Sequence, residues 1–187
     1  MLAATITQRM SQKINIYDLN NSYYLYEDVE HTIDQIGELF EVVFLKNRIE
    51  FISKIKYPEN AFWVSDEVMQ IFNSKIPKIK SIIKDIYATI EGIYVAKQGR
   101  FDKPKVEKKY LDLNILRELN NKIKHHNTKS ITFNITSMIN INDKTLDCLI
   151  QYKFEKENQI KTILLTKLFE LFFIILEDEE VITIDRK

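Results

Sequence analysis

Apolar residues recur at steps of three and four through two long stretches of the chain. The first stretch runs from about residue 28 to residue 56, and Pro58 prevents the helix from continuing. Its apolar positions include Val29, Ile33, Ile36, Phe40 and Val43. The second runs from about residue 65 to residue 98, with Val68, Phe72, Ile79, Ile83, Ile86, Ile90 and Ile93. This spacing places apolar side chains on one face of a helix. The sequence therefore predicts two long amphipathic helices.

The second of these helices carries signals at both ends and one near its middle. Ser65, followed by two acidic residues, is the predicted N-terminal cap. Gly99 fits the C-terminal cap. Pro77 lacks an N–H group, so it should kink the helix or begin a second one near residues 73 to 76. Residues 101 to 109 then form an expected polar, basic loop.

A third helix is predicted over residues 112 to 126, and a change of period follows it. Asp112 can cap this helix, and its apolar positions are Ile115, Leu116, Leu119 and Ile123. From residue 131 the apolar residues occupy alternate positions, as they do in strands. The two alternating series are Ile131, Phe133, Ile135, Ile139, Ile141 and Leu146, Cys148, Ile150, Tyr152, Phe154, separated by a turn at residues 142 to 144. We expect a β-hairpin from about residue 131 to residue 155.

The last predicted helix, residues 161 to 177, is apolar on nearly all sides. Such a helix lies either in the centre of a bundle or in a contact between two chains; we favour central burial and also expect a homodimer. The predicted fold class is mainly α: a helical bundle with long antiparallel helices and one β-hairpin before the C-terminal helix. We expect a single domain over residues 1 to 187, with an irregular N-terminal segment over residues 1 to 27 and a helical core over residues 28 to 126.

Composition narrows the cellular setting. The single cysteine, Cys148, excludes an intramolecular disulfide and has no partner at metal-ligand spacing. The N-terminus lacks the pattern of a signal peptide, and the longest apolar run, residues 171 to 176, is too short to cross a bilayer. We therefore expect a cytoplasmic protein that neither enters a membrane nor carries a cofactor.

Charge is unevenly distributed although the formal net charge is zero. Residues 97 to 129 hold ten Lys and Arg against four acids, whereas residues 27 to 41 hold six acids and neither Lys nor Arg. Residues 177 to 180 form a second acidic block. These runs are either solvated surface or, for the basic run, a local site for an anion or an RNA backbone.

Residues 116 to 127, which we call the motif segment, hold two of the three histidines. At 100° per residue the apolar residues share one face of this helix, and Glu118, Asn121, Lys122 and His125 fall on the opposite face. Arg117, Asn120 and Lys124 form a strip along one flank. His126 lies nearer the apolar edge than His125, so the two histidines face different directions.

The stretch from Asn120 to His125 resembles the signature helix of HEPN domains, which are all-helical proteins. Their hallmark is an Arg followed four to six residues later by a His, often with a polar residue after the Arg and a Lys before the His. In this sequence Asn120 stands where the family has Arg, and Arg117 is one turn earlier. The resemblance covers residues 113 to 127, and the preceding helices only in kind.

The resemblance implies a prokaryotic defence or toxin–antitoxin system, in which catalytic members are dimeric, metal-independent ribonucleases. His and Arg act on the scissile phosphate while the ribose 2′-OH attacks it. His125 can move the proton, but the Asn120 amide carries no charge, so Arg117 or Lys124 would have to supply the cation. On this interpretation, Asn120→Arg should raise activity. The full set of candidates is His125, Asn120, Asn121, Arg117 and His126 for catalysis and Lys122, Lys124, Lys105, Lys108 and Lys109 for RNA binding.

Two other interpretations remain. Many relatives of this kind are non-catalytic, so the chain is alternatively a non-enzymatic helical dimer that binds a partner protein such as an antitoxin. His125 and His126 also fall at a helix end, where the helix dipole favours cations without any catalytic role. A metal site from His125, His126 and Asp112 conflicts with the helical geometry, because the three ligands would not converge.

Overall fold

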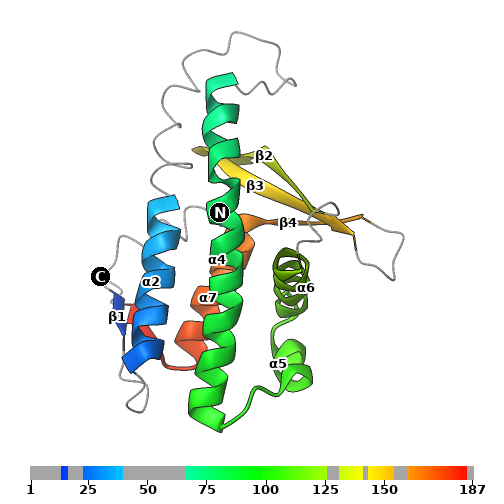
Figure 1. Cartoon of the computed structure of the whole chain (residues 1–187). Coiled ribbons are helices and arrows are strands. Elements are labelled where there is room, and N and C mark those ends of the chain that lie inside the picture. Colours follow the sequence, from blue (N-terminus) through cyan, green and yellow to red (C-terminus); the bar gives the residue numbers. More distant parts are fainter. Residues whose placement is uncertain are drawn as a thin grey trace.

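The computed structural model describes residues 14–16, 23–39, 66–125, 131–140, 143–153 and 160–184. Within these ranges the fold is mainly helical, with two small antiparallel sheets (Figure 1). The elements are, in chain order, β1 (Ile14–Ile16), α2 (Tyr23–Leu39), α4 (Asp66–Gln98), α5 (Lys103–Lys109), α6 (Leu113–Lys124), β2 (Ile131–Asn140), β3 (Asp143–Lys153), β4 (Ile160–Leu164), α7 (Leu165–Asp178) and β5 (Ile182–Ile184).

Helix α4 is the axis of the molecule, with α2 on one side and α5 and α6 on the other (Figure 1). From Phe72 onward, the predicted apolar stripe of α4 is buried, including Ile83, Ile86 and Ile90. At the contact with α2, the Thr89 and Thr32 hydroxyl oxygens lie 3.3 Å apart in the buried interface. Gly92 allows a close approach there, since a Cβ atom at this position would lie 2.9 Å from the Leu25 side chain.

Helix α7 lies in the centre of the structure, behind α4 in the view of Figure 1. Its buried residues are Leu165, Thr166, Leu168, Phe169, Leu171, Phe172, Phe173, Ile175 and Leu176. The prediction of central burial is therefore confirmed. Because one chain covers these side chains, the apolar character of this helix gives no argument for a dimer.

The predicted hairpin is confirmed as β2 and β3, whose register pairs Ile131 with Tyr152, Phe133 with Ile150 and Ile135 with Cys148. A third strand, β4, was not predicted. It takes residues 160 to 164, so α7 begins at Leu165 and not at residue 161. Pairing with β3 decides this boundary, and such pairing between distant residues is not visible in local periodicity.

The described parts of the N-terminal segment, residues 14 to 16 and 23 to 27, form regular elements, whereas the prediction was an irregular segment. Residues 14 to 16 form β1, which pairs with β5 near the other end of the chain, and α2 begins at Tyr23, where the prediction began at residue 28. Pairing between the two ends of a chain cannot be predicted from either short strand alone. The second half of the first predicted helix, residues 40 to 56, lies outside the described residues.

Three predictions around α4 and α6 need revision. Helix α4 continues through Pro77, so no second helix begins there, and the kink at Pro77 stays a prediction. Residues 103 to 109 form a helix, not a loop, because Asp102 accepts a hydrogen bond from the Lys105 N–H and so caps it. Asp112 occupies the N-cap position of α6, but its side chain makes no capping hydrogen bond. Gly99, with φ of 73°, ends α4 as predicted.

Candidate functional site

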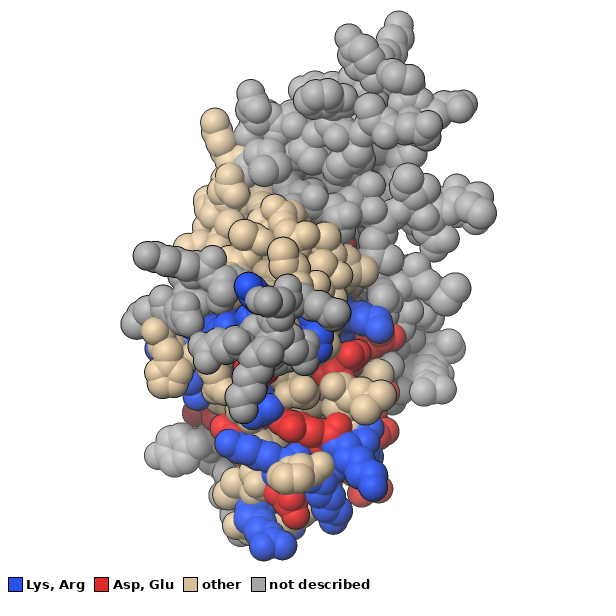
Figure 2. All heavy atoms as spheres, turned by 90° about the vertical axis from the view of Figure 1, so that its right-hand side faces the viewer, with Lys and Arg blue, Asp and Glu red and all other residues tan. Residues whose placement is uncertain are grey.

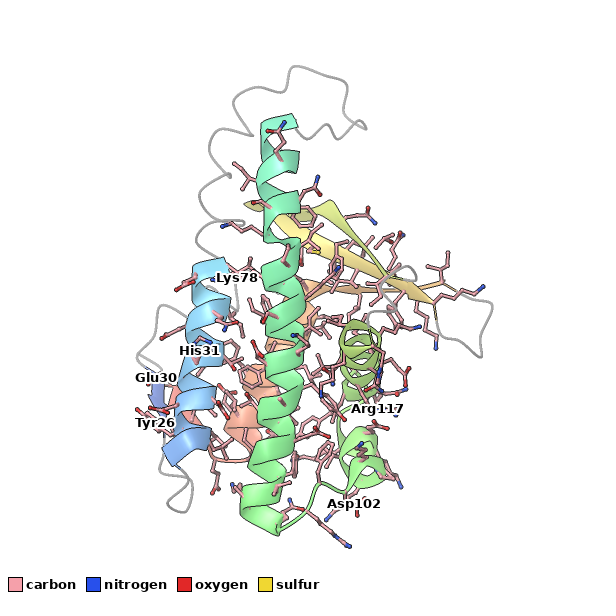
Figure 3. All side chains as sticks on the ribbon, in the orientation of Figure 1. Tyr26, Glu30, His31, Lys78, Asp102 and Arg117 are labelled. Atoms are coloured by element: carbon pink, nitrogen blue, oxygen red, sulfur yellow. The ribbon has the colours of Figure 1, made fainter. Side chains whose placement is uncertain are left out.

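Residues 116 to 124 of the motif segment lie in α6, which packs its apolar face into the core. Leu116 and Leu119 are fully buried, and Ile123 is nearly so. Figure 3 shows Arg117 on this helix, on the opposite side of α4 from Tyr26, Glu30 and His31 of α2. The described part of the motif segment ends at His125, so His126 lies outside the described residues.

Arg117 is held by other side chains of the same chain. Its Nε lies 2.6 Å from Glu107 Oε1, and one terminal nitrogen lies 3.3 Å from Glu118 Oε1. The same terminal nitrogen donates a hydrogen bond of 2.6 Å to Asn114 Oδ1. Two carboxylates therefore more than compensate the single guanidinium charge, so a phosphate placed at Arg117 would also meet nearby negative charge.

Asn120 is buried, with 1% of its surface exposed. Its amide oxygen has no hydrogen-bond partner among the described atoms. The helical wheel places it on a flank beside Arg117 and Lys124, and at Asn120 this flank is buried, because the core reaches further around α6 than the apolar residues alone indicate. A side chain so enclosed does not contact a substrate in this conformation.

The exposed end of α6 carries Asn121, Lys124 and His125. His125 is the C-cap residue, and its backbone N–H donates to Asn121 O. It follows Arg117 by eight residues, which is a rise of about 12 Å along a helix. The Arg117 guanidinium contacts Glu107, Glu118 and Asn114, and no contact between Arg117 and His125 occurs among the described residues. Lys122, expected on the same exposed face, is instead buried at 6% exposure.

The lysines of α5 do not act as one group. Lys105 and Lys108 are exposed, and no carboxylate among the described residues pairs with either. Lys109 lies 3.5 Å from Asp178 and 3.2 Å from Glu179. Partial burial lowers the pKa of Lys109, but the hydrogen bond and charge of Glu179 raise that pKa above its ordinary value.

The acidic block at the end of α7 meets the basic run that begins at the end of α4. The Tyr94 hydroxyl donates to Glu179 Oε1 at 2.7 Å, and the Tyr110 hydroxyl donates to Asp178 Oδ2 at 2.8 Å. Burial, followed by these carboxylates, raises the pKa of both tyrosines. We call Tyr94, Lys109, Tyr110, Asp178 and Glu179 the helix-end cluster. Both charge runs are evident in the sequence, but their meeting depends on the tertiary fold.

The surface over α5 and α6 is consequently of mixed charge. Figure 2, which faces that side, shows Lys and Arg interleaved with Asp and Glu. On the opposite side, α2 exposes Glu27, Asp28, Glu30, Asp34 and Glu38, and among these Glu38 pairs with Lys78. The molecule therefore has an acidic helix face opposite a mixed face that retains Lys105, Lys108 and Lys124.

A buried carboxylate in the sheet was missed by sequence reasoning. Asp147 of β3 is 1% exposed and accepts hydrogen bonds from the Cys148 N–H at 2.7 Å, the Thr166 N–H at 3.4 Å and the Thr166 hydroxyl. Burial raises the pKa of Asp147 to about 6 although these donors oppose the shift. An acidic residue on the polar side of an alternating strand gave no signal of burial.

Within the described ranges, no three His, Cys, Asp or Glu side chains gather closely enough to hold a metal ion. No helix in the same ranges is both long and apolar enough to span a membrane. Comparison of the chain with protein-family models, with curated proteins and with solved structures found no match.

Proposed function

We propose that this chain is a non-enzymatic, HEPN-like helical bundle that forms a homodimer and binds a partner protein in a cytoplasmic prokaryotic defence or toxin–antitoxin system. The observation that carries the proposal is the state of Arg117, which Glu107, Glu118 and Asn114 hold in place. The buried position of Asn120 points in the same direction.

Phosphate cleavage by this helix would depend on the charge beside the scissile phosphate. Cleavage by a 2′-OH needs a group that moves a proton and a fixed cation where negative charge develops. Arg117 already lies against two carboxylates, which outweigh its single positive charge, and Asn120 is both uncharged and enclosed. A module that binds a protein needs neither group to be free. The exposed Lys105 and Lys108 on one side and the acidic face of α2 on the other offer contacts to a partner of complementary charge.

A metal-independent ribonuclease is the second candidate, because His125, Asn121 and Lys124 are exposed together at the end of α6. In such an enzyme His125 would move the proton, and Lys124 or a second chain would supply the positive charge. This candidate depends on a dimer that brings two α6 helices face to face.

RNA cleavage in EDTA distinguishes the two candidates. The purified full chain and a His125→Ala variant are incubated with single-stranded and structured RNA. We expect both to leave the RNA intact. Cleavage by the wild-type chain that disappears in the variant would establish the ribonuclease and overturn the non-enzymatic proposal.

Partner binding is tested by co-expressing the chain with the product of the adjacent gene and measuring complex formation. Lys105→Glu with Lys108→Glu should weaken a complex made through α5, and Glu30→Lys with Asp34→Lys should weaken one made through α2. Failure of the two proteins to associate would remove this partner class.

A further inference from the structure

Strand β2 borders the three-stranded sheet. The strand order is β2-β3-β4, so among the described residues β2 pairs only with β3. It is ten residues long, and Figure 1 shows it on the side of the sheet away from α6. A bordering strand of this length presents a row of backbone N–H and C=O groups that another strand can pair with.

The sequence of β2 lacks the features that usually prevent such pairing. Residues 131 to 140, ITFNITSMIN, contain no charged residue, no proline and no glycine. Natural edge strands are commonly protected by lysines, prolines, bulges or short length. The opposite edge, β4, follows this rule, since it has only five residues and contains Lys161. The difference between the two edges singles out β2 as a pairing surface.

We propose that β2 pairs antiparallel with β2 of a second copy of this chain, which joins the two three-stranded sheets into one continuous sheet. This inference rests on the homodimer of the proposed function and names its contact surface. A two-fold axis brings each residue close to a copy of itself or of its neighbours, so any charge near the axis would meet a like charge. A strand without charged residues is compatible with its own copy.

The alternation of β2 also restricts the register. Ile131 is buried and Phe133 is partly buried on the face that packs against the helices, whereas Thr132 and Asn134 are exposed on the other face. Pairing odd-numbered with odd-numbered residues keeps the two apolar faces continuous, whereas a shift by one residue places apolar against polar faces. An axis through Ile135 satisfies this condition at the centre of the strand. Asn134 of one protomer then lies opposite Thr136 of its partner.

The test uses Asn134, which is exposed and lies next to the proposed axis. Association of the full chain is measured by sedimentation velocity at protein concentrations on the order of tens of micromolar, which suit a dimer of moderate affinity. Asn134→Lys and Asn134→Glu each place like charges close together across the axis, so each should raise the dimer dissociation constant about tenfold. An equimolar mixture of the two variants should restore association, because opposite charges then meet. Circular dichroism checks that each variant is folded.

Thr162→Lys is the matched control, because Thr162 is exposed on the other edge strand, β4. It should leave the dissociation constant unchanged.

Asn121→Lys tests the alternative contact through α6. A wild-type chain that remains monomeric would remove both the homodimer and the β2 contact. A dimer that Asn121→Lys weakens and the Asn134 variants leave intact would remove the β2 contact alone. A monomeric chain would also remove the ribonuclease candidate, which depends on a dimer through α6. Partner binding is measured separately, so its failure is distinguishable from failure of the β2 contact.

Discussion

The carboxylate of Asp147 on β3 caps the first turn of α7 through Thr166. The register between β3 and β4 pairs Leu149 with Leu164, and two further steps along each chain place Asp147 opposite Thr166. Leu164, the N-cap residue of α7, has no side chain that can accept a hydrogen bond. Asp147 therefore serves from a neighbouring strand the role that a capping residue usually serves within the helix.

Replacement of Asp147 by Asn should remove a pH dependence of stability. The pKa of Asp147 is about 6 in the folded chain and 3.8 when unperturbed. The folded state therefore binds the proton more tightly, so this residue favours folding below pH 3.8 and loses that contribution as the pH rises to 6. The span corresponds to roughly 3 kcal/mol at about 1.4 kcal/mol per pH unit.

The measurement is urea unfolding of the wild-type and Asp147→Asn chains at pH 4.5, 6 and 7.5. Between pH 4.5 and 6 the wild-type chain should lose stability relative to the variant, so the unfolding free energy of the variant minus that of the wild type should increase. Above about pH 7 this difference should stay constant. A difference that is the same at all three pH values would show that Asp147 keeps an ordinary pKa when folded.

Thr166→Val should shift the same transition to higher pH. The Thr166 hydroxyl donates to the Asp147 carboxylate and opposes the rise of its pKa. Valine keeps the shape but leaves the buried carboxylate with one donor fewer, at a cost of about 1–3 kcal/mol. The loss of stability should be larger at pH 7.5 than at pH 4.5. An equal loss at both values would assign Thr166 a packing role only.

The Asp147 cap illustrates how far the sequence predicts this fold. Periodicity predicts α4, α6 and the hairpin, because the spacing of apolar residues within each helix or strand defines its buried face. It does not predict β4, or the pairing of β1 with β5, because both depend on residues far away in the chain. Asp147 was missed for the same reason: its burial comes from α7, which begins 18 residues later.

The candidate site was predicted less well than the fold. The histidine end of α6 is exposed as the helical wheel predicts, but Asn120 and Lys122 are buried. A helical wheel ranks positions by the apolar residues of one helix and does not include the neighbours that cover its flanks. The partners of Arg117 include Glu118 next to it in sequence, but Glu107 contacts it only because residues 103 to 109 form a helix.

Lys109→Met should destabilise the fold slightly, because Lys109 joins α5 to the end of α7 through Asp178 and Glu179. These groups are partly exposed, so solvent screens the pairs, and the expected loss is about 0.5–1 kcal/mol. Lys105→Met on the same helix is the control and should change stability by less than about 0.5 kcal/mol. In 1 M salt the difference between the two variants should shrink. A salt-independent difference would point to packing of the Lys109 stem over the Tyr110 ring.

Arg117→Met should lower the unfolding free energy by about 1–2 kcal/mol, because it leaves the partly buried Glu107 and Glu118 without their cation. Adding Glu107→Gln should recover part of the loss, since the uncompensated charge is removed. Lys124→Met, on the exposed end of the same helix, is the control. If an Arg117 variant cleaves less RNA than the wild-type chain, its unfolding free energy shows whether lost stability accounts for the difference. If the single and double variants are equally stable, Arg117 does not serve as the counter-charge for Glu107.

Asn120→Arg should destabilise the fold and not create a ribonuclease. The position is 1% exposed, so the longer guanidinium would be forced into a packed interior, at a cost of about 3 kcal/mol or more. Asn121→Arg, at the neighbouring exposed position, should be tolerated and is the matched control. Urea unfolding and RNA cleavage are measured on both.

Since Asn121 and Lys124 lie on the exposed end of α6 with His125, Asn121→Arg and Lys124→Arg are the variants that place a guanidinium at that end without disturbing the core. If either cleaves RNA and loses that activity with His125→Ala, the end of α6 is a latent catalytic surface. If a stable Asn120→Arg chain cleaves RNA, the buried position of Asn120 does not describe the active conformation.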